Sequence, residues 1–206
     1  MKKLYFISSF LLLSIALSEG MVAQEKGERV NVKEVPRVVC YTRTEIPPKL
    51  GNALHLGYSE DGRHYVALNN DACVMALRKV DNEPGLSEEQ KIPGVMKTLK
   101  APYLFRMAEG GFGVIALRTD KNGMSDPSAT GSFLFIKSRD LVHYEPEQLC
   151  HLPVGEALEA ISCEFDEAVG KYRIRWMIKG KVFQSHTADF LHVSPVKVAS
   201  RLDGVQ

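Results

Sequence analysis

Apolar and polar residues alternate in short runs along most of the chain, and this pattern predicts strands rather than helices. The runs are separated by clusters of Gly, Asn, Asp and Pro, which are typical of turns. One helical turn is expected at Ser87 to Gln90, inside a loop over residues 81–97. The sequence therefore predicts an all-β fold. The expected strands cover residues 35–42, 54–58, 64–68, 103–107, 112–118, 133–138, 163–165, 172–178 and 181–186.

A short polar pattern occurs three times, each time after an apolar strand. Ser or Thr is followed by Asp two residues later and by His five residues later, at residues 59–64, 138–143 and 187–192. Short polar side chains of this kind bond the backbone of a turn. The pattern alternates with hairpins at 102–117 and 161–177. Since repeats decide architecture, this predicts four-stranded antiparallel units at about 35–80, 100–150 and 160–198, as in propeller blades. The alternative is coincidence within an all-β protein.

The N-terminus has the layout of a secretory signal peptide. Lys2 and Lys3 precede an uncharged run from Leu4 to Leu17, and the small-residue exit Met21-Val22-Ala23 follows. At about 1.5 Å per residue, this run is shorter than a bilayer core of roughly 30 Å. We predict a signal peptide at 1–23, a polar leader at 24–34 and a propeller-like domain at 35–206. The mature protein is then secreted or periplasmic, without a membrane association; the alternative is an N-terminal membrane anchor.

Composition narrows the possible partners and cofactors. The chain has 206 residues, with 26 Lys and Arg against 25 Asp and Glu, so no basic field favours a nucleic-acid partner.

Export permits disulfides, and four cysteines allow three full pairings. The alternative is that they are small buried hydrophobes. No Cys-x-x-Cys motif occurs, so neither a metal nor another cofactor is predicted. The cysteines are Cys40, Cys73, Cys150 and Cys163.

Several segments resemble family 43 glycoside hydrolases and related five-bladed propellers. Residues 54–62 (LHLGYSEDG) and 67–70 (ALNN) are similar to the first blade of that family. Residues 138–144 (SRDLVHY) resemble its S-x-D-L-V-H-W turn, and residues 166–172 (DEAVGKY) resemble its D-E-x-x-G-K-Y turn. The resemblance implies a β-propeller that acts on arabinose- and xylose-containing plant glycans by an inverting mechanism with carboxylates. The expected partner is therefore a plant-type glycan or oligosaccharide.

The residues that would carry catalysis depart from the family pattern. Ala101 stands where the resemblance implies an Asp, and Ser162 stands where it implies the Glu that acts as the acid. Glu164 lies two residues after Ser162, and strand alternation would keep both on one face. Glu164 is thus the candidate catalytic residue, with a polar residue on a solvated strand face as the alternative. The sole tryptophan, Trp176, is the candidate platform for stacking on a sugar, and core packing is its alternative.

The number of repeat units is too small for a closed propeller. Five blades at roughly 40–45 residues each need over 200 residues, and rings start at about four blades. We therefore expect an incomplete five-bladed array from a truncated chain, or one that a second chain completes. Its open end should expose an unpaired strand edge and apolar inner surface. The sequence thus predicts a secreted, glycoside-hydrolase-like protein with impaired catalysis; the alternative is a non-catalytic glycan-binding protein or a remnant propeller.

Overall fold

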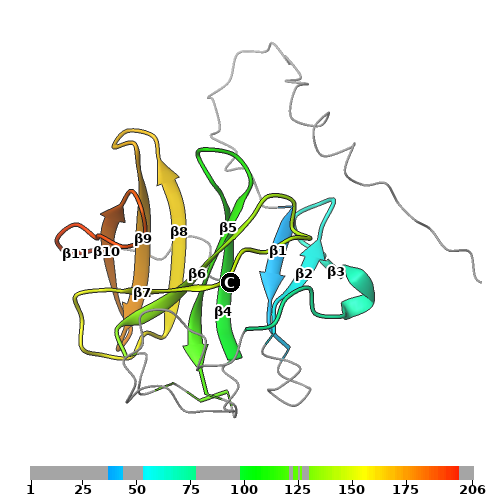
Figure 1. The fold of residues 1–206 in the computed structure, drawn as a ribbon, viewed down its shortest axis with the longest axis horizontal. Coiled ribbons are helices and arrows are strands. Elements are labelled where there is room, and N and C mark those ends of the chain that lie inside the picture. Colours follow the sequence, from blue (N-terminus) through cyan, green and yellow to red (C-terminus); the bar gives the residue numbers. More distant parts are fainter. Residues whose placement is uncertain are drawn as a thin grey trace, which may run out of the picture. The chain divides into compact units, whose positions relative to one another are not determined.

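The computed structural model describes residues 37–43, 53–77, 98–120, 123–124, 126 and 130–199. The predicted signal peptide, the polar leader and the helical turn at Ser87 to Gln90 lie outside these residues. The described part contains strands and one short 3₁₀ turn, η1 (Asn69–Asp71), but no α-helix (Figure 1). It accordingly has no helix of the length and apolarity needed to cross a bilayer. The all-β prediction is confirmed.

The strands form three antiparallel sheets in which each strand pairs with the next along the chain. The first sheet contains β1 (Val38–Tyr41), β2 (His55–Tyr58) and β3 (Val66–Ala67). The second contains β4 (Thr98–Arg106), β5 (Phe112–Thr119), β6 (Ser132–Ser138) and β7 (Gln148–His151). The third contains β8 (Ala160–Asp166), β9 (Lys171–Ile178), β10 (Lys181–Thr187) and β11 (Lys197–Val198). The second and third sheets have the four strands predicted for each repeat unit, whereas the first has three among the described residues.

Two short strands and the bounds of several others, most of all the start of β4, differ from the sequence-based prediction. The sequence analysis did not predict β7 and β11, which are short outer strands held by their neighbours rather than by a strong apolar pattern. Strand β4 begins at Thr98 rather than at Tyr103, because the chain passes Pro102 in a bulge between Lys100 and Tyr103. Proline lacks an N–H group, so it is tolerated in a strand at an edge or a bulge, and β4 is an edge strand.

The repeated turn shows how the strands of the three sheets correspond. It joins β6 to β7 and β10 to β11, which are the third and fourth strands of their sheets. In the first sheet the same turn joins β2 to β3. Strands β1, β2 and β3 therefore correspond to the second, third and fourth strands of the other sheets. Within the described ranges, the first sheet has no counterpart of β4 and β8.

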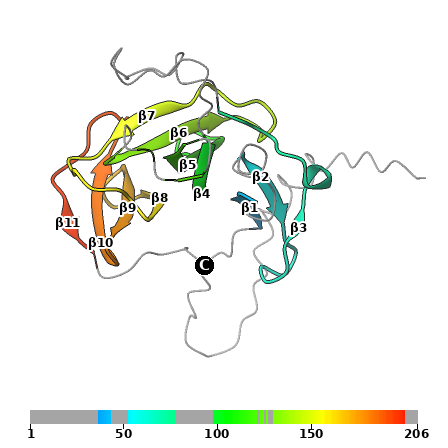
Figure 2. The same cartoon turned by 90° about the horizontal axis from the view of Figure 1, so that it is seen from below.

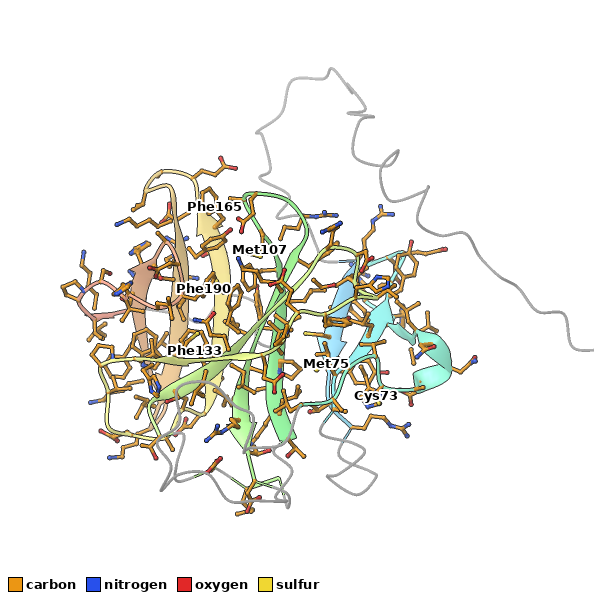
Figure 3. The ribbon with its side chains drawn as sticks, in the orientation of Figure 1. Cys73, Met75, Met107, Phe133, Phe165 and Phe190 are labelled. Atoms are coloured by element: carbon orange, nitrogen blue, oxygen red, sulfur yellow. The ribbon has the colours of Figure 1, made fainter. Side chains whose placement is uncertain are left out.

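The second sheet buries both of its faces. Ile115 and Phe133 lie on one face, in a cluster shared with the third sheet. Val114 and Leu134 lie on the other face, in a cluster with Leu54, next to β2, and with Cys40 of β1. Figure 2 shows the second sheet between the other two. Figure 3 labels Phe133 and Met107 of the first cluster.

The third sheet buries one face deeply and the other only in part. Ile174 and Trp176 are fully buried in the cluster shared with the second sheet. The opposite face carries the residues that alternate with them, and it is polar. The pairing of β8 with β9 places Ser162 opposite Arg175 and Glu164 opposite Arg173 on that face. Charged side chains therefore occupy much of this outward face.

All four cysteines are free thiols. Cys150 and Cys163 are buried in the cluster between the second and third sheets. Burial raises the pKa of the Cys150 thiol to about 12 and also raises the pKa values of Cys163 and Cys40. These three thiols pack as small hydrophobic side chains, as the alternative interpretation held. Cys73 differs because it is exposed, near Met75 of the first sheet's region (Figure 3).

Candidate functional site

The three repeated turns have the same hydrogen bonds. One oxygen of each aspartate accepts the backbone N–H groups two and three residues later. Its other oxygen lies 2.6 to 2.8 Å from Nδ1 of the histidine. The Ser or Thr hydroxyl accepts the N–H three residues later, at 2.8 Å in every turn. The predicted role of the pattern in building the turn is confirmed. The pairs are Asp61–His64, Asp140–His143 and Asp189–His192.

These bonds stabilise the ionised form of the aspartates. The pKa of each carboxyl is held well below its usual range. For Asp61 and Asp140 the largest cause is the backbone N–H of the histidine, and for Asp189 it is the His192 side chain. A carboxylate that accepts several N–H bonds gives up its proton readily and is a poor proton donor. The turns are thus rigid structural elements with exposed histidines.

Position 101, where the resemblance implies a carboxylate, carries only a methyl group. Ala101 lies in the β4 bulge with φ of 47°, a left-handed conformation that is costly for a residue other than glycine. Its side chain is partly buried against the cluster between the second and third sheets. A methyl group can neither take up a proton nor position water, so this position supplies no acid–base chemistry.

Glu164 belongs to a network of charges on the outward face of the third sheet. Its Oε1 accepts hydrogen bonds from Nε and Nη2 of Arg173, at 3.0 and 2.6 Å. The same oxygen lies 3.3 Å from Nη1 of Arg175. Arg173 also contacts Asp166 at 3.1 Å, and Asp166 lies 3.3 Å from Nε2 of His186. The geometry of Glu164 is that of an ion-pair partner on a partly solvated strand face.

The structure places the other two predicted residues away from any open surface that a sugar could reach. Ser162 shares the face of Glu164, as strand alternation predicts, but only 4% of it is exposed. Trp176 lies on the opposite face of the sheet, fully buried, with its ring stacked 6.2 Å from that of Phe183. Its ring face is therefore not available for stacking on a sugar. Glu164 and Trp176 are not brought together.

The sequence analysis missed a buried ion pair between Arg118, near the end of β5, and Asp126. Nε of Arg118 is 2.9 Å from Oδ2 of Asp126, and both side chains are almost completely buried. They line a cavity of about 30 Å³ beside Lys100 and Leu158. Sites for small organic ligands start at roughly 300 Å³, so this cavity does not admit a sugar ring. Asp126 precedes Pro127 in the sequence, and no local pattern pairs it with Arg118.

A larger hollow lies beside the second repeated turn. It is a groove of about 330 Å³, lined by Arg139, Asp140, His143, Tyr144 and Glu145. The groove is open to solvent, since the His143 side chain in its lining is 84% exposed. The lining residues are polar or aromatic, and they come from one short stretch of chain. The groove can therefore offer hydrogen bonds to a small polar ligand.

The described residues contain no group of three or more His, Cys, Asp and Glu side chains that could hold a metal ion. The chain matches no family model, no curated protein and no solved structure. The likeness to family 43 glycoside hydrolases therefore remains a prediction from the segments quoted above.

Proposed function

We propose that this chain is a secreted or periplasmic, glycoside-hydrolase-like protein, related to arabinan- and xylan-acting glycosidases, in which catalysis is impaired. The resemblance of residues 54–62, 138–144 and 166–172 supports the family. The apolar run after Lys3 supports export. Two observations support the loss of catalysis. The Glu164 carboxylate is paired with Arg173 and Arg175, and Ala101 stands where the resemblance implies an Asp.

The chemistry of inverting hydrolysis explains why these substitutions matter. It needs two carboxyl groups about 6.5–9.5 Å apart, one to activate water and one to protonate the leaving oxygen. Each contributes roughly 10²- to 10⁴-fold to the rate. Glu164 is paired with Arg173 and Arg175, and the buried Asp126 is paired with Arg118. Neither carboxylate is among the described residues that line the groove of about 330 Å³.

We further propose that the three sheets are the blades of an incomplete five-bladed propeller. Three observations support this arrangement. Each sheet is a meander in chain order, the repeated turn occupies the same place in all three sheets, and the second sheet packs against a neighbour on each face. The edge strand β4 also lies beside both β1 and β8, as inner strands of neighbouring blades do.

Turnover of activated aryl glycosides tests the proposal. We expect purified protein to hydrolyse aryl arabinofuranoside and aryl xyloside no faster than buffer does. The variant Glu164→Gln should behave like the wild type. Glu167→Gln is the matched control, because it removes an exposed carboxylate from the adjacent turn. Robust activity that Glu164→Gln abolishes and Glu167→Gln leaves intact would overturn the proposal and assign the catalytic acid to Glu164.

A second candidate function is glycan binding without catalysis. The groove beside the second repeated turn favours it, since it is the larger of the two hollows described and its lining is polar. The two candidates are compatible, because a protein that has lost its carboxylates can keep a binding surface.

A further inference from the structure

The wall of the groove is rigid before any ligand arrives. The Ser138 hydroxyl accepts the N–H of Leu141 and donates to the carbonyl of His143, both at 2.8 Å. The Tyr144 hydroxyl donates to the carbonyl of Leu141 at 2.9 Å. Asp140 holds the backbone N–H and the ring of His143. A backbone fixed in this way does not have to be ordered on binding, so that only exposed side chains such as Arg139 and Glu145 lose freedom.

The turn between β4 and β5 contacts the start of the second repeated turn, which forms this wall. Gly111 has φ of +78°, and a Cβ atom at this position would lie 2.9 Å from the carbonyl oxygen of Ser138. Only glycine allows this approach, because any side chain would displace the turn or strain the backbone. The close contact fixes the position of the groove relative to the second sheet.

The second turn differs from the other two at the positions that line the groove. The residue after the hydroxyl residue is Arg139, whereas the corresponding residues are Glu60 and Ala188. Glu145 follows two residues after the histidine, and its counterparts are Val66 and Ser194. Only the second turn therefore places a cation and an anion on either side of the hydrogen bonds that all three turns share. Arg139 and Glu145 are both exposed, and among the described residues neither has an ion-pair partner.

The charges of the lining indicate the class of ligand. Arg139 offers several N–H donors, Glu145 offers acceptor oxygens, and His143 offers a ring nitrogen. An anionic ligand would meet Asp140 and Glu145, and a cationic ligand would meet Arg139. Hydroxyl groups of a sugar both donate and accept, so they satisfy both kinds of side chain without a net charge. The half-buried ring of Tyr144 adds an apolar surface for the C–H groups of a sugar.

We propose that this groove binds one or two sugar units of a neutral glycan, in contact with Arg139, His143 and Glu145. The proposal rests on the glycan-related function proposed above and adds a site to it. The site lies on the turn between β6 and β7, away from positions 101 and 164, so binding here needs no catalytic carboxylate.

An NMR titration of the ¹⁵N-labelled exported protein tests the site. We expect neutral xylotriose or arabinotriose to shift the amide signals of residues 138–145, and trigalacturonate to shift them less. Arg139→Ala removes hydrogen bonds from a charged donor and should weaken binding about tenfold or more. Glu60→Ala, at the same place in the first turn, is the matched control and should leave the affinity unchanged.

Each other outcome has a definite meaning. Shifts confined to another surface would keep glycan binding but overturn this site. Stronger binding of trigalacturonate would overturn the neutral ligand, and the absence of shifts with all three probes would overturn the proposal. The hydrolysis assay is independent of these results, because it tests catalysis at Glu164 rather than binding at Arg139.

Discussion

The second and third sheets have almost the same strands but different faces. The second sheet has apolar residues on both faces, for example Ile115 on one and Val114 on the other, both fully buried. The third sheet has an apolar face around Trp176 and a charged face around Arg173. A sheet with two apolar faces needs a neighbour on each side, whereas a sheet with one charged face ends a stack. The charged face of the third sheet is therefore packed differently from either face of the second sheet.

The ion pairs on the charged face affect whether a further sheet could pack on it. The face carries Arg173 and Arg175 against Glu164 and Asp166, and these side chains are 13 to 44% exposed. Ion pairs at such partly exposed positions contribute little to stability. A further sheet packed on this face would have to desolvate both arginines, which is costly unless every charge is paired again. The desolvation of these charges therefore disfavours the packing of a further sheet on this face.

Introducing a lysine on each face should give the largest difference between the two sheets. Ile136→Lys buries an unpaired charge on the second sheet, because Ile136 is only 1% exposed, and should cost more than about 4 kcal/mol. Met177→Lys, on the charged face of the third sheet, should cost about 1 kcal/mol or less. Urea unfolding followed by circular dichroism measures both.

Ile136→Ala provides a variant for the case in which Ile136→Lys does not fold. It should lose about 2–5 kcal/mol, since it leaves a cavity in a packed face. Equal losses for Met177→Lys and Ile136→Lys would mean that the outward face of the third sheet is covered, and the comparison between the two sheets would fail.

The difference between the faces of the two sheets can largely be predicted from the sequence. Residues 113–117 (GVIAL) and 133–136 (FLFI) are continuous apolar runs, which are typical of strands buried on both faces. Residues 172–176 (YRIRW) alternate strictly, which is typical of a strand with one solvated face. The repeated turn is predictable for the same reason: its bonds are local, within six residues of chain. The outer strands β7 and β11 are not predictable from the sequence, because they are determined by pairing with a neighbouring strand rather than by a local pattern.

The candidate site could be predicted only in part. That Ser162 and Glu164 share a face follows from the period of a strand. That Glu164 faces two arginines does not, because it depends on the register between β8 and β9. The pair of Arg118 and Asp126 depends on how a loop folds back on a strand end. The groove depends on the close approach of Gly111 to the second turn.

Acid should weaken the third sheet before the second. A hydrogen bond from His186, followed by the charge of Arg173, holds the pKa of Asp166 below its usual range. A carboxyl with a folded-state pKa below its unfolded value of about 3.9 contributes stability above that pH, and this contribution is lost as the pH falls through the folded pKa. Protonation of Asp166 removes one of the anions that face Arg173. In the second sheet the pair of Arg118 and Asp126 lies at the end of β5, and among the described residues the apolar clusters around Ile115 and Val114 contain no carboxylate.

Hydrogen exchange at pH 6 and at pH 3 measures this difference. We expect the amides of β9 and β10 to lose protection at the lower pH while those of β5 and β6 keep it. Asp166→Asn should reduce the pH dependence of exchange in β9. The turn aspartates titrate in all three sheets, so they affect the sheets alike. Loss of protection in β5 first, or in all strands together, would contradict the expectation.

The smallest expected effect distinguishes the turns of the two sheets. The third residue after the hydroxyl residue has a positive φ in every turn: Gly62 (70°), Leu141 (62°) and Phe190 (63°). This conformation costs roughly 1–2 kcal/mol for a residue other than glycine, while the entropy of glycine offsets part of the gain. Leu141 is only half-buried, so Leu141→Gly should stabilise the protein by about 0.5 kcal/mol. Phe190 is 2% exposed and stacks 3.8 Å from Phe135, so Phe190→Gly should instead destabilise it by removing core packing. Thermal unfolding of the two variants measures the sign, and a loss of stability in both would mean that the left-handed backbone of the second turn is not strained.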